Sequence, residues 1–162
     1  MAMTTFWEWT LTIGVEPSGK MASRARAQGI EVHSGVAEEL PFPDDRFDFV
    51  LMVTTICFVD DVPRSFGEAL RVLRTGGFII VGFVDKESEL GTKYSENREG
   101  SRFYRDAIFF STPEVLTYLR ESGFAITKIL QALIPGESPK ATMEGFGRGA
   151  FVVIKGMKTM VS

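Results

Sequence analysis

The sequence has few of the residues that build metal sites and disulfide frameworks. Among its 162 residues there is one cysteine, Cys57, and one histidine, His33. A lone cysteine excludes a disulfide within the chain and a cysteine-rich metal site, and one histidine leaves few ways to bind zinc. We therefore expect no metal site. We interpret Cys57, which lies in an apolar stretch, as a buried structural thiol.

The chain also lacks a surplus of positive charge and a long apolar run. With 18 basic and 21 acidic residues its net charge is −3, which argues against nucleic acid or an anionic membrane as a partner. The longest strongly apolar run, Phe49 to Val59, is far too short to span a bilayer. The first residues, MAMTTFWEWT, contain no Lys or Arg and match a signal peptide poorly. We therefore expect a cytoplasmic protein.

The residues that are present describe an ordinary globular protein, with 44% hydrophobic and 24% charged side chains. The length suits one core, so we expect a single domain over residues 1–162. Alternating apolar and polar residues from Trp7 to Val15 predict a strand. Pro17 and Ser18 predict the start of a helix that stops at Gly29. Similar patterns predict strands at 30–33, 47–53, 78–84, 125–133 and 150–155, and helices at 63–73 and from Ser111 or Thr112 to Gly123.

The alternation of strands and helices favours an α/β fold, with a mostly parallel sheet and helices on both faces. Residues 47–53 are apolar and bounded by acids, which predicts a central strand buried on both faces. The last two strands have no helix between them, so we expect them to form an antiparallel pair. Ligands in such sheets bind outside the carboxyl ends of the strands. This rule places Glu16, Val36, Thr54 and Asp85 near one rim.

Glu16 follows a predicted strand and precedes a predicted helix. A carboxylate there can accept hydrogen bonds from both ribose hydroxyls of an adenosine, because its two oxygens match a vicinal diol. The alternative is an ordinary solvent-facing glutamate in a turn.

Two glycine-containing patterns imitate nucleotide loops. Residues 14–21 nearly match the phosphate-binding pattern G-x-x-x-x-G-K-[ST]. Met21 has no hydroxyl for magnesium, Glu16 would repel phosphate and Pro17 removes an N–H donor, so nucleotide binding is a remote alternative. Residues 145–149 precede a strand, whereas a dinucleotide loop follows one. We expect a turn there.

Several motifs occur together in order: GVEPS at 14–18, GVAEELPFP at 35–43, FDFV at 47–50 and LRVLRTGGF at 70–78. They resemble the class I S-adenosylmethionine-dependent methyltransferases, most closely the small-molecule, methyltransferase type 11-like branch with its G-x-A-E-x-L-P-F loop. The resemblance runs from Leu11 to Lys155. It implies a Rossmann-like fold, S-adenosylmethionine (S-adenosyl-L-methionine) as the cofactor, and methyl transfer to a small-molecule acceptor.

The resemblance also implies roles for individual positions. Residues 16–21 would hold the ribose and flank the adenine, residues 36–38 would line the adenine, and residues 54–55 would face the methionine part or the methyl donor. The implied cofactor-binding residues are Glu16, Pro17, Ser18, Met21, Val36, Ala37, Glu38, Thr54 and Thr55.

The family begins with a strand, a glycine-rich loop and a helix, and no glycine-rich loop follows a strand in this sequence. We therefore expect a chain that is truncated at its N-terminus and lacks the loop for the methionine half of the cofactor. A second hypothesis is a non-catalytic methyltransferase-like fragment. Its unpaired strand edges would invite pairing with another chain, which predicts a homo-oligomer.

Residues 85–110 are charged, with aromatic residues interleaved, and they follow a predicted buried strand. We expect them to lie over the binding rim as a candidate substrate lid, with Tyr94 and Tyr104 as the candidate substrate residues. Their rings could also stabilise the sulfonium cation through cation–π interactions. The alternative is a solvated helix with a few packed aromatic rings. The sequence suggests no general base, so the catalytic residue stays unassigned.

Overall fold

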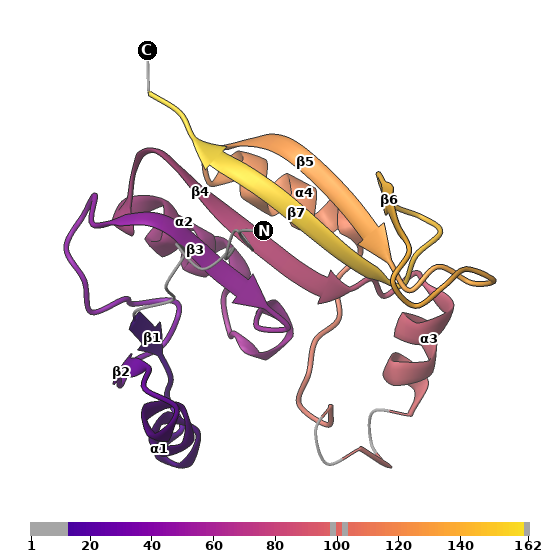
Figure 1. Ribbon diagram of the computed structural model, residues 1–162, viewed down its shortest axis with the longest axis horizontal. Helices are drawn as coiled ribbons and strands as arrows, with labels where there is room; N and C mark the ends of the chain where they lie inside the picture. The colour runs from indigo at the N-terminus through magenta and orange to yellow at the C-terminus, as the bar shows by residue number, and fades with distance from the viewer. Residues whose placement is uncertain (1–12, 98–99, 102–103, 161–162) are drawn as a thin grey trace, which may run out of the picture.

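The computed structural model describes residues 13–97, 100–101 and 104–160. Within these residues a five-stranded sheet has the order β3-β4-β7-β5-β6, and a separate two-stranded sheet pairs β1 with β2 (Figure 1). The strands are β1 (Ile13–Val15), β2 (Glu31–His33), β3 (Phe47–Val53), β4 (Leu73–Val84), β5 (Phe124–Ala132), β6 (Thr142–Glu144) and β7 (Phe151–Lys158). The helices are α1 (Gly19–Ala27), α2 (Val62–Val72), α3 (Glu89–Glu96) and α4 (Thr112–Glu121), with a 3-10 turn η1 (Ile56–Phe58).

The large sheet is mixed, so the prediction of a mostly parallel sheet is wrong. β3 and β4 run parallel, whereas the β4–β7, β7–β5 and β5–β6 pairs are antiparallel. The cause is β7, which returns along the sheet and inserts between β4 and β5 (Figure 1). The predicted antiparallel pairing of the last two long strands is confirmed by the β5–β7 ladder.

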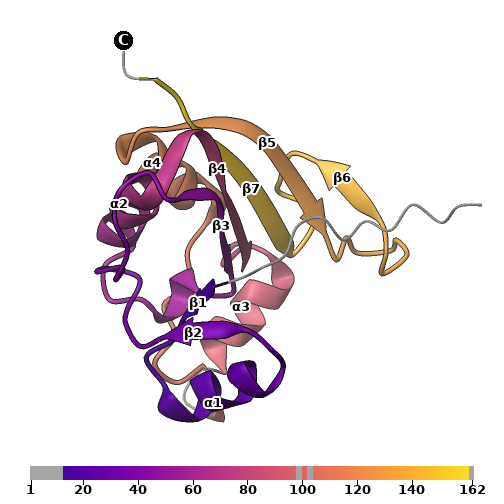
Figure 2. The same ribbon diagram turned by 60° about the vertical axis from the view of Figure 1, so that its left-hand side comes forward.

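Helices α2 and α4 pack on the same face of the large sheet (Figures 1 and 2). The predicted cover by helices on both faces is therefore not found among the described residues. The core lies between these helices and the sheet. It includes Phe66 of α2, Leu119 of α4, Ile79 and Val81 of β4, and Ile154 of β7.

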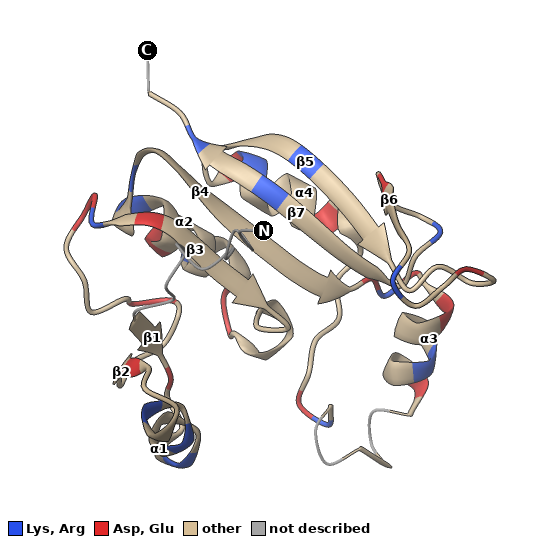
Figure 3. Ribbon diagram, in the orientation of Figure 1, with Lys and Arg blue, Asp and Glu red and all other residues tan. Residues whose placement is uncertain are grey.

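β3 confirms the strand predicted at 47–53, but the prediction that it is buried on both faces is wrong. Val50 and Met52 pack into the core, whereas Leu51 is 42% and Val53 is 44% exposed. Successive side chains of a strand point to opposite faces, and no described helix covers the second face. Figure 3 shows basic residues on this sheet at β5 and β7.

The first strand is described only in part. Ile13–Val15 form β1, which pairs in parallel with β2, and the rest of the strand predicted from Trp7 lies outside the described residues. α1 begins where predicted, because the Ser18 side chain accepts the N–H of Met21 as an N-cap. The helix stops before Gly29, whose φ of +85° lies in a region that glycine adopts without steric strain.

The capping signals of α4 are also confirmed. Ser111 is the N-cap, and its side chain and that of Glu114 form a reciprocal capping box. Gly123 ends the helix with a φ of +102°. No helix among the described residues is long and apolar enough to cross a membrane.

Candidate functional site

The segments that follow β1, β2 and β3 meet at one rim. The N–H of Glu16 donates to the carbonyl of His33 at 3.1 Å, which continues the β1–β2 ladder past its last pair. Glu38 Oε1 accepts the N–H groups of Asp60 at 2.7 Å and Asp61 at 3.2 Å. These bonds tie the loop after β2 to the turn after β3. The ends of β2 and β3 are therefore joined, at the edge where α/β sheets bind ligands. Asp85, the fourth residue predicted at this rim, is buried, and its carboxylate accepts the N–H and the hydroxyl of Thr112.

Glu16 is half-buried at the end of β1. Its Oε1 accepts the N–H of Ser18 at 2.8 Å, so the carboxylate lies at the N-terminus of α1, where the helix dipole favours negative charge. A carboxylate has about four acceptor positions, so the bond to Ser18 leaves capacity for a diol. Pro17 and Ser18 are exposed, and Met21 is 50% exposed.

The loop after β2 folds into a tight turn, closed by a bridge between Val36 and Glu39. Val36 is 45% exposed and presents an apolar side chain at the rim. Ala37 packs against the core. The N–H groups of Asp60 and Asp61 engage only Oε1 of Glu38, so Oε2 keeps the capacity to accept a hydrogen bond.

Thr54 ends β3 in a strained conformation. Its φ is +53°, a region that a β-branched residue rarely adopts and that costs of order 1–3 kcal/mol. The Thr54 N–H donates to the carbonyl of Gly82 at 2.7 Å. The hydroxyls of Thr54 and Thr55 both donate to the carbonyl of Val53, at 2.7 and 3.2 Å. Such strain concentrates at functional sites.

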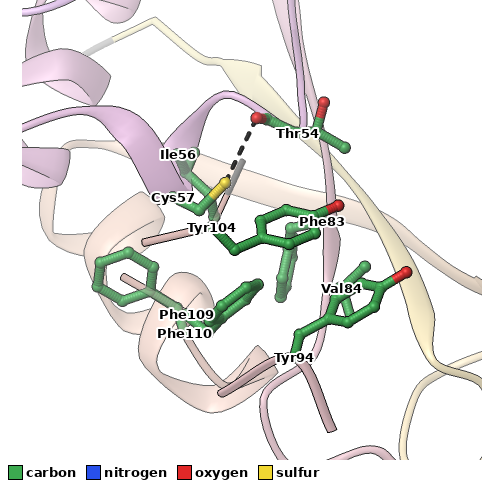
Figure 4. A pocket seen from close by; sticks show the side chains of 9 residues that line it. All are labelled: Thr54, Ile56, Cys57, Phe83, Val84, Tyr94, Tyr104, Phe109 and Phe110. Carbon is green, nitrogen blue, oxygen red and sulfur yellow. Dashed lines mark hydrogen bonds between the residues drawn. The ribbon is translucent and has the colours of Figure 1, made fainter. Parts of the chain in front are cut away.

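A cavity of about 30 Å³ lies beside Thr54, at the carboxyl ends of β3 and β4. Figure 4 shows Cys57 from η1, Tyr94 from α3 and Tyr104 from the following loop around this one space. The structure thus brings both predicted substrate residues together with Thr54. It also adds residues that the sequence reasoning missed, namely Cys57, Phe109 and Phe110.

The aromatic rings of the cavity form a cluster. Tyr94 and Tyr104 are stacked, with ring centroids 4.8 Å apart and an interplanar angle of 23°. Phe109 lies 5.7 Å from Tyr104 and 6.2 Å from Tyr94. Burial raises the pKa of Tyr104, and the neighbouring Tyr94 and Cys57 add to the rise. Tyr104 therefore stays protonated at neutral pH.

Cys57 differs from its predicted environment. The side chain is half-buried instead of buried, and its Sγ donates to the carbonyl of Thr54 at 3.4 Å. Burial raises the pKa of the thiol, so little of it is thiolate at neutral pH and its alkylation is slow. A structural thiol at the cavity wall fits these contacts. The sequence pattern did not predict that Cys57 lines the cavity, because the position of the short 3-10 turn η1 depends on tertiary packing.

The structure shows what the two glycine-containing patterns, at 14–21 and 145–149, form. Gly14 lies in β1 and Gly19 begins α1, so residues 16–18 link the strand to the helix. Pro17 has no N–H and the N–H of Ser18 donates to Glu16, so these two residues offer no free donor to a phosphate. Before β7, Gln131 Oε1 accepts the N–H groups of Arg148 and Gly149 in the predicted turn. Within the described residues, no group of three or more His, Cys, Asp and Glu side chains could hold a metal ion.

The fold defines an α/β protein, and the similarity of its sequence to known proteins specifies the family. A family model described as "Methyltransferase domain" matches residues 3–81. A crystal structure from Thermotoga maritima, described as a SAM-dependent methyltransferase and "possible histamine N-methyltransferase", is 51% identical with a TM-score of 0.85. That alignment covers 90% of this chain and 72% of the other.

An uncharacterised protein of Methanocaldococcus jannaschii is 40% identical over 153 residues, which are 93% of this chain and 75% of that protein. A demethylmenaquinone methyltransferase of Thermobifida fusca is 39% identical over 71 residues, which are 44% of this chain and 28% of that protein. The chain belongs to the class I S-adenosylmethionine-dependent methyltransferase family.

Proposed function

We propose that this chain transfers a methyl group from S-adenosylmethionine to a small-molecule acceptor. The observation that carries the proposal is the aromatic cavity beside Thr54, on the rim that also bears Glu16. An adenosine held by Glu16 would lie at the carboxyl end of β1, and an acceptor in the cavity would lie at the carboxyl ends of β3 and β4. Family membership supports the reaction class.

The residues at the rim fit the cofactor. Glu16 would accept hydrogen bonds from the ribose hydroxyls, residues 17–21 would flank the ribose, and Val36 and Ala37 would line the adenine. Thr54 and Thr55 would face the methionine part. S-adenosylmethionine supplies an electrophilic methyl group whose transfer leaves the bonding electron pair on sulfur.

The chain itself contributes position and a dry environment. Holding two reacting groups in line can contribute about 7–11 kcal/mol. The hydrogen bond from Thr54 to Gly82 fixes the turn where the reacting groups would meet. The rings of Tyr94, Tyr104 and Phe109 line the cavity and would shield the reacting groups from bulk water. α3 carries Tyr94 into the cavity wall, which supports the described part of residues 85–110 as a substrate lid.

The proposal is tested by calorimetry with S-adenosylmethionine. We expect wild-type binding and, for Glu16→Ala, an affinity lower by about tenfold or more, because a hydrogen bond to a charged group contributes about 1.5–3 kcal/mol. Glu121→Gln, at an exposed position at the end of α4, is the control and should bind as wild type.

No heat of binding at millimolar cofactor would overturn the proposal for this chain. It would favour the second hypothesis, a non-catalytic, oligomerising methyltransferase-like protein. An unchanged affinity in Glu16→Ala would contradict only the proposed role of Glu16 in binding the ribose. Analytical ultracentrifugation, which reads the mass against the 18.0 kDa of one chain, tests the predicted homo-oligomer independently.

A further inference from the structure

We propose that the acceptor is an uncharged planar aromatic molecule that stacks on the ring of Tyr104, and that Tyr94 occupies this stacking position until the acceptor displaces it. The proposal rests on the proposed function, since it names the class of acceptor for the same site. It goes further by giving the two tyrosines different roles, one as the platform and the other as a removable cover.

The ring geometry favours a planar ligand over a compact cation. The Tyr94 and Tyr104 rings are within 23° of parallel and 4.8 Å apart, which is the offset stack that aromatic pairs prefer. A cage for an ammonium ion needs ring faces that surround a central cation. In the described structure the space between these two faces is closed. Tyr94 therefore shows the shape that fits on Tyr104, which is a flat ring.

Tyr104 is the inner ring of the pair. Figure 4 shows Tyr104 between Cys57 and Tyr94 along the cavity. Burial raises the pKa of Tyr104, and Tyr94 and Cys57 add to the rise, so its hydroxyl stays protonated. The described lining offers aromatic and aliphatic carbon, hydroxyls and a protonated thiol. Such walls stabilise an uncharged ring, because a charge transferred into them loses its hydration.

Tyr94 must move for a ring to bind. A cavity of about 30 Å³ holds roughly one water molecule, far less than an aromatic ring. The helix that carries Tyr94 is weakly attached, since Gly91 is the only buried residue of α3. Few buried apolar contacts mean that little free energy opposes local displacement. The N-cap Ser88, whose hydroxyl accepts the N–H of Gly91 at 3.0 Å, can keep the start of α3 in place.

Cys57 gives a direct readout of cavity occupancy. It lines the cavity and is the only cysteine of the chain, so alkylation by iodoacetamide reports one position. We compare protection by benzyl alcohol and by cyclohexylmethanol, which are both neutral and of similar size, but only the first has a planar ring. We expect benzyl alcohol to protect with a dissociation constant about threefold to tenfold lower, the range that aromatic pairing provides beyond area burial.

Variants separate the platform from the cover. Tyr104→Leu should abolish the preference for benzyl alcohol, and Tyr104→Phe, which keeps the ring, should retain it. Tyr94→Leu should speed alkylation of the free protein and tighten the binding of benzyl alcohol, because no ring has to be displaced.

Equal protection by the two alcohols in the wild-type chain, or protection by neither, would overturn the proposal, and this comparison needs no variant to fold. Weaker benzyl alcohol binding in Tyr94→Leu would overturn the role of Tyr94 as a cover. Calorimetry with S-adenosylmethionine is run on the same samples. A chain that prefers benzyl alcohol but does not bind the cofactor would refute the proposed function and leave the aromatic site standing.

Discussion

Arg71 attaches the loop after β2 to the main sheet. Its guanidinium donates to the carbonyls of Leu40 at 3.1 Å and Phe42 at 2.8 Å, and it pairs with Glu68 at 2.6 Å and Asp44 at 2.8 Å. A planar fork with five N–H donors can make all these bonds at once, which a lysine cannot. One side chain of α2 thus positions the segment that precedes β3.

The pairing with Arg71 makes part of the stability depend on pH. The hydrogen bond from Arg71 lowers the pKa of Glu68 below its reference value of 4.5. A carboxylate with a lowered folded pKa stabilises the protein above its unfolded pKa, and this contribution disappears as the pH falls through the folded pKa. We expect Glu68→Gln to reduce the free energy of unfolding by about 1–3 kcal/mol near neutral pH.

Urea denaturation at several pH values measures this effect. The difference between wild type and Glu68→Gln should shrink steadily as the pH falls from above 4.5 through the lowered pKa of Glu68. Glu121→Gln, at an exposed position, serves as the control without a pH-dependent difference. A wild-type advantage that is as large in acid as at neutral pH would contradict the assignment to Glu68.

At the scale of elements, the glycines of α2 and α3 have opposite environments. A Cβ added to Gly67 of α2 meets no atom within 4 Å, whereas one added to Gly91 of α3 would overlap the carbonyl oxygen of Asp85. Gly67→Ala should therefore stabilise the protein by about 0.5–1 kcal/mol through helix propensity. Gly91→Ala should destabilise it by about 1–3 kcal/mol through overpacking.

The displacement of α3 has a second consequence at the cavity. Because α3 carries Tyr94, Gly91→Ala should also increase the rate of Cys57 alkylation, and Gly67→Ala should leave that rate unchanged. Thermal unfolding and alkylation are measured on the same preparations. If the two alanine variants have the same unfolding temperature, the close approach of α3 to the backbone of Asp85 does not exist in solution.

At the scale of the whole molecule, the two sheets differ in the length of their strands and in the number of buried residues that support them. Within the described part of the chain, β1 and β2 have three residues each, and Ala22 is the only buried residue of α1. β4 has 12 residues, with neighbours on both sides. A small two-stranded sheet with little apolar burial opens locally more often than a core strand.

Amide hydrogen exchange should reveal this difference. We expect residues 13–33 to exchange at least about a hundredfold faster than the buried part of β4, as a locally opening unit does. Saturating S-adenosylmethionine should slow exchange in residues 13–40, because the proposed adenosine contacts lie there. Equal protection of both sheets without cofactor would show that the two sheets open as one unit.

The sequence by itself determined most of the elements and the family. Helix ends at Ser18, Asp61, Ser111 and Gly123 follow from side chains that bond the nearest backbone groups or release the chain into a left-handed turn. The 47–53 strand follows from its apolar run. Such signals act within a few residues, so the local sequence carries them completely.

Only the tertiary structure decided the arrangement of those elements. The short strand β6 was missed, β7 inserts between β4 and β5, and α2 and α4 share one face, so the sheet is mixed and β3 keeps one face open. The cavity likewise joins Thr54, Cys57, Tyr94 and Tyr104 from separate segments. Strand order and side-chain convergence depend on packing between distant residues, and neighbours in sequence do not encode that packing.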